Sequence, residues 1–191
     1  GVYVLIESLK VDKHRLDIDT STDLQGSYLL ELTTSNRLSD GEPYITTAIA
    51  DQVMAIKYPK DTALTSAHKS YIKDYLNDFE KALYNMSFSG VNDYKNYIDV
   101  PSFIDHMLVS EIVRQLDAFC ASHHFYKDAH GKLAMGPGWD YNRSIGNYKG
   151  HDEWKKTGFW LTSTRGGCKP FWSWNIYEDE SFMSAYRQRY R

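Results

Sequence analysis

The spacing of apolar residues changes twice along this 191-residue chain, and that change constrains the fold more than any other feature. Up to about residue 60, apolar and polar residues alternate in short runs, which is typical of β-strands. From Ser66 to Leu116, apolar residues recur every three or four positions, which predicts helices. Alternation then returns. This order predicts an α+β fold rather than a doubly wound parallel sheet.

The strands of the first part are separated by turn-forming residues. Residues 2–18 alternate as in a strand, around a basic stretch, 10–15, that suits a hairpin turn or an exposed strand. Residues 26–33 predict a further strand, and residues 44–58 are rich in β-forming residues at both ends. A turn at 40–43 lies between them. We therefore expect a small antiparallel sheet ahead of the helices.

Two helices follow. Ser66 is a suitable N-cap for the first, whose apolar positions continue to Leu83. Asp99 is a suitable N-cap for the second, and Pro101 fits its first turn because the missing N–H has no partner there. An apolar stripe continues to Leu116, so the second helix is expected to lie in the core.

Two aspartates frame the next segment. Asp117 follows the second apolar stripe, and Asp140 comes 140 − 117 = 23 residues later, after a predicted β-hairpin over 124–135. Protein kinases use a similar plan, in which one aspartate accepts the proton of the substrate hydroxyl and another holds Mg²⁺. An aspartate at a helix end is also commonly a solvated surface residue. A short helix is expected at 180–191.

The segment around Asp140 is rich in glycine and carries a second oxygen ligand. On an extended backbone Asp140 and Asn142 would face the same side, so Asn142 could supply a neutral carbonyl ligand beside the carboxylate. Gly136, Gly138 and Gly146 permit close backbone approach. The alternative interpretation is a structural turn with a buried tryptophan.

Composition excludes several classes of protein. The balance of 22 basic and 25 acidic residues gives a net charge of −3, which argues against a dedicated nucleic-acid-binding domain. An aromatic content of 15% argues against a disordered chain, and no apolar run approaches 18 residues. Cys120 and Cys168 permit one disulfide, but two partly buried free thiols are the favoured interpretation.

Several motifs together resemble the CotH kinase family, the spore-coat protein H type of atypical, secretory-type protein kinases. The matching segments are GVYVLIE (1–7), GSYLLE (26–31), YPK (58–60), SYIKDYLNDFEKAL (70–83), YIDVPSFIDH (97–106), EIVRQLD (111–117), GPGWDYN (136–142) and Gly146-Asn147. The resemblance spans nearly the whole chain, and the WDYN element with its upstream aspartate is the most specific part.

The resemblance implies a protein-kinase-like fold in one domain, 1–191. Residues 1–60 would form a partial antiparallel β-lobe, and residues 61–191 a larger, mainly helical lobe with a β-hairpin at the active site. Asp117 resembles the catalytic base. Asp140 resembles the aspartate that binds Mg²⁺ (or Mn²⁺), with Asn142 where many members carry a second aspartate.

The implied reaction transfers the γ-phosphoryl group of ATP to serine or threonine of proteins at a bacterial cell surface or spore coat, outside the cytoplasm. Ser122 stands where kinases usually carry a metal-binding asparagine. No G-x-G-x-x-G loop is visible, and the chain is expected to begin part-way into the small lobe. Lys10, Lys13 and Arg15 are therefore only candidates for binding the phosphates. The fragment could be inactive without the upstream part.

Other interpretations stay open at this stage. A non-catalytic module for coat assembly or glycan binding would keep the same fold, and a glycoside hydrolase would use Asp117 and Asp140 as its carboxylate pair. His123, His124, His130 and His151 suggest zinc, but neighbouring strand positions face apart. Glu7 or Glu31 could pair with a lysine, although charges on edge strands are commoner. Trp154, Trp160, Trp172 and Trp174 could stack on sugars or lie in the core.

Overall fold

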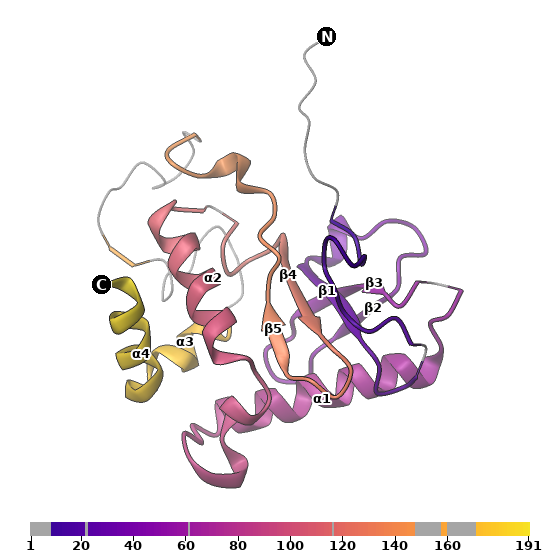
Figure 1. Cartoon of the computed structure of the whole chain (residues 1–191), viewed down its shortest axis with the longest axis horizontal. Helices are drawn as coiled ribbons and strands as arrows, with labels where there is room; N and C mark the ends of the chain where they lie inside the picture. The colour runs from indigo at the N-terminus through magenta and orange to yellow at the C-terminus, as the bar shows by residue number, and fades with distance from the viewer. Residues whose placement is uncertain (1–8, 22, 61, 116, 148–157, 160–170) are drawn as a thin grey trace.

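The protein folds as one antiparallel sheet with helices packed against it (Figure 1). The computed structural model describes residues 9–21, 23–60, 62–115, 117–147, 158–159 and 171–191. The strands are β1 (Tyr28–Thr33), β2 (Tyr44–Thr46), β3 (Val53–Tyr58), β4 (His123–Lys127) and β5 (Leu133–Met135). The helices are α1 (Ser66–Tyr84), α2 (Val100–Ile112), α3 (Ser173–Tyr177) and α4 (Glu180–Tyr190). The predicted α+β class is confirmed.

The sheet contains strands that lie on both sides of α1 and α2 in the sequence. Its order is β2-β3-β1-β4-β5, and each neighbouring pair is antiparallel. The central strand β1 pairs Glu31 with Ala55 of β3 on one side and with His124 of β4 on the other. The predicted hairpin is thus confirmed as β4 and β5. It extends the sheet of the first 60 residues, and the kinase-like arrangement of lobes stays a prediction.

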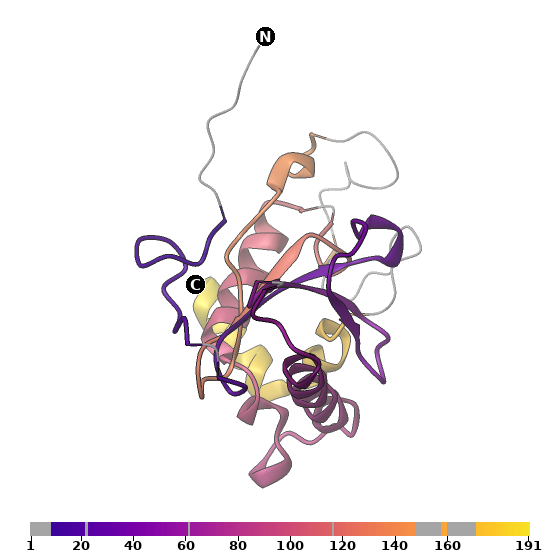
Figure 2. The ribbon, with the colours of Figure 1, turned by 90° about the vertical axis from the view of Figure 1, so that its right-hand side faces the viewer.

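The two faces of the sheet differ in character. Tyr28, Leu30 and Leu32 of β1 belong to the hydrophobic core, whereas the intervening Leu29 and Glu31 line a cleft on the opposite face. This is the alternation expected of a strand with one face in the core. In Figure 2, α1 lies beneath the sheet. The sheet thereby separates the packed core from the open cleft.

Lys127 is a cation on the core side of β4. The residue is 2% exposed, and its Nζ lies 5.6 Å from the ring centre of Tyr71 and 5.2 Å from that of Tyr75. Its hydrogen bond to the Asp128 carbonyl is long, at 3.4 Å. Burial lowers the pKa of Lys127, and the nearby Asp128 opposes that shift. The tyrosine faces are therefore its main favourable contacts.

Helix α1 begins one residue earlier than predicted. Thr65 is the N-cap, and its side chain forms a reciprocal capping box with His68, so Ser66 is the first helical residue. The predicted apolar positions point into the core, where Ile72, Leu76 and Phe79 are fully buried. This helix is otherwise as the sequence predicts.

Helix α2 ends earlier than its apolar stripe predicts. Asp99 caps its N-terminus by accepting the N–H of Ser102, as expected, but the helix stops at Ile112 instead of Leu116. Arg114 has a φ of 53°, which a continuing α-helix cannot contain. Ile112 is 65% exposed, so the stripe is not continuously buried. Asp117 therefore lies in a turn beyond the helix.

The N-terminal part that the structure describes is a loop and not a strand. Val11 and Leu16 form a single β-bridge, and the Arg15 N–H donates to the Asp12 carbonyl at 2.8 Å to close the turn between them. Of the two structures expected for the basic stretch, a turn and an exposed strand, the turn is confirmed. Residues 2–8 of the predicted strand, including Glu7, lie outside the described residues.

The C-terminal helices close the core. α4 matches the predicted terminal helix, and α3 was not expected. Trp172 is fully buried, packs against Phe79 at 4.8 Å between ring centres, and donates its indole N–H to Glu80 at 2.8 Å. Glu80 also accepts the backbone N–H groups of Ile49 and Ala50. Trp172 is therefore a core residue and not a sugar-stacking surface residue.

The interpretation of two free thiols is wrong. Cys120 is disulfide-bonded, and the chain contains one other cysteine, Cys168, which lies outside the described residues. Composition cannot distinguish a buried thiol from a bonded one, because both are removed from water.

Candidate functional site

The backbone at Asp140 is left-handed rather than extended. Asp140 has φ 57° and ψ 53°, and it precedes the 3₁₀ turn η4 (Tyr141–Arg143). Aspartate is one of the few residues that adopt this conformation readily. The prediction that Asp140 and Asn142 share one side of an extended strand is therefore wrong. Asn142 is exposed, and its backbone carbonyl accepts a hydrogen bond from the Asn147 side chain at 2.7 Å.

Two hydrogen bonds made by side chains are among those that join the Asp117 and Asp140 segments. Arg143 Nη1 donates to Asp117 Oδ1 at 3.3 Å, and Gln115 Nε2 donates to the Asp140 carbonyl at 2.7 Å. Each segment thus contributes one side chain that holds the other. The structure brings the two predicted aspartates into neighbouring segments, although they are separated by the whole β4–β5 hairpin.

The donor chemistry here fits a hard divalent cation. Asp117 is 9% exposed, whereas the half-buried Asp140 carboxylate has no hydrogen bond or ion pair with any residue that the structure describes. Carboxylate oxygens are the ligands that Mg²⁺ prefers, and it keeps several waters when few protein ligands are present. Within the described ranges, no group of three His, Cys, Asp or Glu side chains is placed to hold a metal ion. Asp140 and Asn142 as metal ligands stay a prediction.

A cleft with a volume of about 800 Å³ opens on the face of the sheet opposite the core. This volume is within the range of small-molecule sites. The cleft combines apolar walls with three lysines. Its lining residues are Leu9, Lys10, Val11, Thr20, Leu29, Glu31, Lys57, Tyr58, Lys60, His124 and Trp139. Trp139 lines this cleft, and the next residue in the sequence is Asp140, the predicted metal-binding aspartate.

Lys57 of β3 is the best-positioned cation in the cleft. Its Nζ lies 2.8 Å from Glu31 Oε2 on the neighbouring strand, and it also forms an ion pair with Glu42. Partial burial disfavours the charged amine, but the hydrogen bonds to Glu31 and Glu42 outweigh it and raise the pKa of Lys57. Glu31 lies on the central strand and pairs with a lysine. The interpretation of Glu31 as an edge-strand charge is therefore wrong.

His124 is a neutral side chain beside this pair. It is 3% exposed, its Nε2 lies 4.0 Å from Glu31 Oε2, and its ring meets Trp139 edge-on at 6.2 Å. Burial lowers the pKa of His124 to about 4, and the positive charge of Lys57 adds to the shift. Among the described residues, its buried Nδ1 has no hydrogen-bond partner.

His123 faces the other way and belongs to the core. Its Nε2 accepts the N–H of Phe119 at 3.2 Å, and its Nδ1 lies 2.6 Å from Nε2 of His106. Because Nε2 of His123 accepts, its Nδ1 carries the proton and donates a hydrogen bond to Nε2 of His106. Burial lowers the pKa of His106 to about 4 and that of His123 well below its usual value. His130 lies in the exposed hairpin turn, and His151 lies outside the described residues.

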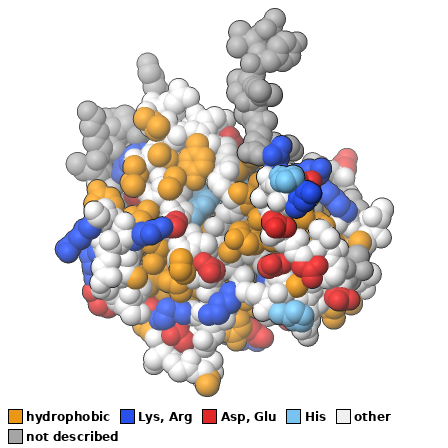
Figure 3. All heavy atoms as spheres, in the orientation of Figure 1, with side chains coloured by type: hydrophobic (Ala, Val, Ile, Leu, Met, Phe, Trp, Pro, Cys, Tyr) orange, Lys and Arg blue, Asp and Glu red, His pale blue; other side chains and the backbone are white. Residues whose placement is uncertain are grey.

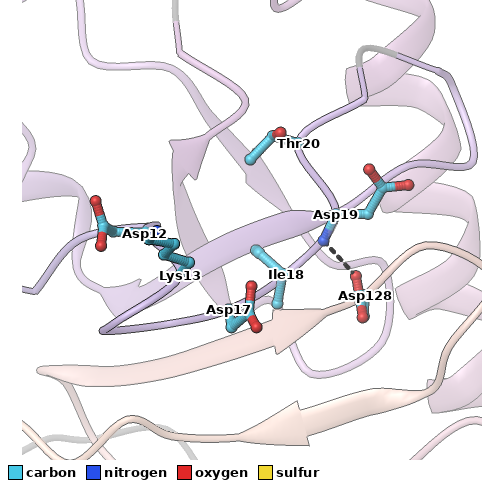
Figure 4. A pocket seen from close by; sticks show the side chains of 7 residues that line it. All are labelled: Asp12, Lys13, Asp17, Ile18, Asp19, Thr20 and Asp128. Carbon is cyan, nitrogen blue, oxygen red and sulfur yellow. Dashed lines mark hydrogen bonds between the residues drawn. The ribbon is translucent and has the colours of Figure 1, made fainter.

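The three predicted phosphate-binding cations do not converge. Lys10 lines the cleft and an adjoining hollow that also contains His14, Arg15 and Trp139. Lys13 lines a different hollow, together with four aspartates (Figure 4). In that hollow the Asp19 N–H donates to Asp128 Oδ1 at 2.8 Å. Lys10 is thus the only one of the three that shares the cleft with Lys57.

Sequence reasoning missed Lys57, Gln115 and Arg143. A signal for Lys57 exists, because it is the one charged residue in the otherwise apolar run of β3. Nothing in the sequence marks Gln115 or Arg143, because their contacts depend on how the hairpin returns the chain to the end of α2. Over the face seen in Figure 3, acidic and basic side chains are interspersed.

Comparison with known families identifies the chain. The model of the CotH kinase protein family matches residues 1–191, so the chain belongs to the CotH kinase family. Comparison with the curated proteins and with the solved structures gave no match. No helix in the described part of the chain is long and apolar enough to cross a membrane.

Proposed function

We propose that this domain transfers the γ-phosphoryl group of ATP to serine or threonine hydroxyls of surface or coat proteins. Membership of the CotH kinase family supports this reaction class. The observation that carries the proposal for this chain is the cleft, where the Lys57–Glu31 ion pair and Trp139 line one cavity and Asp140 follows directly. Protein kinases depend on a comparable lysine–glutamate pair near a metal-binding aspartate.

Each residue has a role that its surroundings support. Lys57, held by Glu31, would bind the phosphates, and Lys10 and Lys60 at the same cleft would add positive charge. Asp117, nearly buried and held by Arg143, would accept the proton of the attacking hydroxyl. Asp140, with Asn142 as a further candidate, would hold Mg²⁺ or Mn²⁺, which neutralises charge on the transferred group when bound.

The apolar walls favour a nucleotide over a simple anion. Leu9, Val11 and Leu29 line the same cleft as the lysines, and Trp139 adds an aromatic surface. An adenine ring needs an apolar slot, whereas the phosphates need cations, and this cleft offers both. In protein kinases the glutamate of the pair comes from a helix, whereas Glu31 lies on the neighbouring strand.

Radiolabelled phosphate transfer tests the proposal. The purified protein is incubated with γ-³²P-ATP and Mg²⁺ or Mn²⁺, alone and with a serine-rich acceptor protein. Asp117→Asn should abolish transfer and spare nucleotide binding, whereas Asp140→Asn should abolish metal-dependent nucleotide binding. Lys57→Met should weaken binding, and Lys73→Met, on the exposed face of α1, is its matched control. Full transfer by the two aspartate variants would refute the assignment.

A non-catalytic binding module is the second candidate, because Lys57 and Asp117 are already engaged in ion pairs. Calorimetry separates the two. Binding of Mg·ATP supports the kinase, and binding of oligosaccharides without nucleotide supports the module. Release of reducing sugar ends that depended on both Asp117 and Asp140 would instead indicate a glycoside hydrolase.

We also propose that the domain acts outside the cytoplasm, at a bacterial cell surface or spore coat. The disulfide at Cys120 supports this location, because such bonds persist in oxidising compartments and are rare in the cytosol. Mass mapping of unreduced peptides from the protein isolated from its own cells tests it. Quantitative alkylation of Cys120 without prior reduction would refute the location.

A further inference from the structure

Lys57 is shared between two carboxylates rather than one. Glu31 contacts it from the neighbouring strand at 2.8 Å, and Glu42 contacts it from the turn over residues 39–42. The side chain of Lys57 is 33% exposed, so it still faces the cleft. Two carboxylates against one ammonium leave a net local charge of −1, where a phosphate-binding site needs positive charge.

The position of Glu42 is built into the fold. Its Oε2 accepts the Ser39 N–H at 3.0 Å while its Oε1 contacts Lys57, so both oxygens have partners. The turn is closed by the Glu42 N–H donating to the Ser39 carbonyl at 3.0 Å. The next residue, Pro43, accepts the N–H of Ile56 at 2.8 Å, which ties the turn to the strand beside Lys57. The contact is therefore preorganised.

Glu42 and Glu31 differ in what else they can do. Glu31 lies on the central strand and lines the cleft, whereas Glu42 lies outside the strands and is not among the residues that line it. Glu31 thus orients the lysine from within the cleft. Glu42 contacts the same amine from outside the cleft. Its carboxylate therefore occupies the lysine without helping to bind a phosphate.

We propose that Glu42 sets the nucleotide affinity of this domain by competing with the phosphates for Lys57. Binding of ATP then requires that Lys57 exchange its contact with Glu42 for a phosphate oxygen while Glu31 keeps its own. The lysine has three N–H donors, so it can hold Glu31 and a phosphate together. The inference rests on the proposed function, because it assigns a ligand to the same lysine.

Calorimetry with Mg·ATP on three variants of the whole domain tests the inference. Glu42→Gln removes the competing charge and should lower the Kd about five- to tenfold, since the pair is only partly exposed. Glu42→Asp keeps the charge but shortens the reach by one methylene, and its Kd should lie between those of wild type and Glu42→Gln. Glu31→Gln should raise the Kd, because it removes the orienting partner.

Asp40→Asn is the matched control for net charge. Asp40 belongs to the same loop, is exposed, and forms no ion pair with any residue that the structure describes. The Kd of Asp40→Asn for Mg·ATP should stay within about twofold of the wild-type value. An equal gain in Asp40→Asn and Glu42→Gln, or no gain in Glu42→Gln, overturns the role of Glu42 and leaves the proposed function intact. Absence of nucleotide binding in wild type and in every variant overturns both.

Discussion

Arg143 donates a hydrogen bond from Nη1 to the carboxylate of Asp117, at 3.3 Å, across the 26 residues that contain the whole β4–β5 hairpin. One ion pair thus fixes the carboxylate that we assign as the catalytic base to the turn that follows Asp140. Gln115 makes the reverse connection to the Asp140 carbonyl. The two segments are therefore held together without any ligand.

Removing this connection should affect turnover more than binding. Arg143→Met is expected to lower kcat for phosphoryl transfer at least about tenfold, because the base loses its fixed orientation, while the KM for Mg·ATP changes less than about twofold. Arg37→Met, in the exposed turn η1 (Ser35–Arg37), is the control. Steady-state kinetics of both variants checks this. A rise in KM at unchanged kcat would show that Arg143 serves nucleotide binding instead.

Glu80 should be essential for stability. Its carboxylate accepts three hydrogen bonds, from the backbone N–H groups of Ile49 and Ala50 and from the indole of Trp172. Glu80→Met would leave three donors without this partner, and those of Ala50 and Trp172 are buried. Each buried unpaired donor costs about 1–3 kcal/mol, so the free energy of unfolding should fall by at least about 2 kcal/mol. Urea unfolding measures this, with the exposed Glu178→Met as control. A loss below about 1 kcal/mol would contradict the importance of this contact.

Replacing the buried cation Lys127 should not weaken the fold. Lys127→Met keeps the length of the side chain and removes a charge whose main contacts are two tyrosine rings. At pH 7 the variant should be more stable by about 1 kcal/mol, because desolvating a cation costs more than such contacts return. The pKa of Lys127 is lowered in the folded state, so the unfolded chain binds more protons. The wild type therefore gains stability as the pH rises toward about 10.4, the pKa of lysine in the unfolded chain. The difference between the two proteins should therefore shrink at high pH.

Acid should destabilise the domain before its carboxylates titrate. His106 and His124 have pKa values lowered to about 4 by burial, against about 6.5 in the unfolded chain. Between these values the unfolded chain binds more protons, so stability is complete above about pH 6.5 and decreases as the pH falls to 4. Each histidine contributes on the order of 3 kcal/mol across that window.

Urea titrations between pH 4 and pH 8 check this dependence. In His124→Gln the slope of unfolding free energy against pH should decrease by about 1.4 kcal/mol per pH unit, the amount for one proton. The control is His130→Gln in the exposed hairpin turn, which should keep the wild-type slope. An unchanged slope in His124→Gln would show that this histidine is not buried in solution.

Local patterns predicted the elements that show a clear periodicity in their own residues. Helix α1, strand β1 and the β4–β5 hairpin follow from periodicity, and Asp99 caps α2 as predicted. The features that were missed depend on contacts between distant residues. The Asp140 carbonyl is held by Gln115, a contact with no local signal. Lys57 is marked locally only as the one charge in β3, and its role is identified by its ion pairs with Glu31 and Glu42.

The same limit explains the shortened helix and the oxidised cysteine. An apolar stripe through Leu116 cannot reveal that Arg114 is left-handed, because apolar spacing carries no information about the backbone of a single residue. The disulfide at Cys120 has no local signal, because pairing depends on which parts of the chain the fold brings together. For the candidate site, the sequence identified Asp117 and Asp140 as candidates but not the cleft that opens beside Trp139.

The central position of β1 has a consequence for synthesis on the ribosome. One edge of β1 pairs with β3 within about 30 residues, but the other edge pairs with β4, whose first residue, His123, follows Thr33 by 90 residues. Until β4 has been translated and has left the exit tunnel, that edge is an unpaired template for other strands. The nascent chain must therefore keep this edge of β1 shielded until β4 has emerged, and premature termination before residue 123 would release an aggregation-prone fragment.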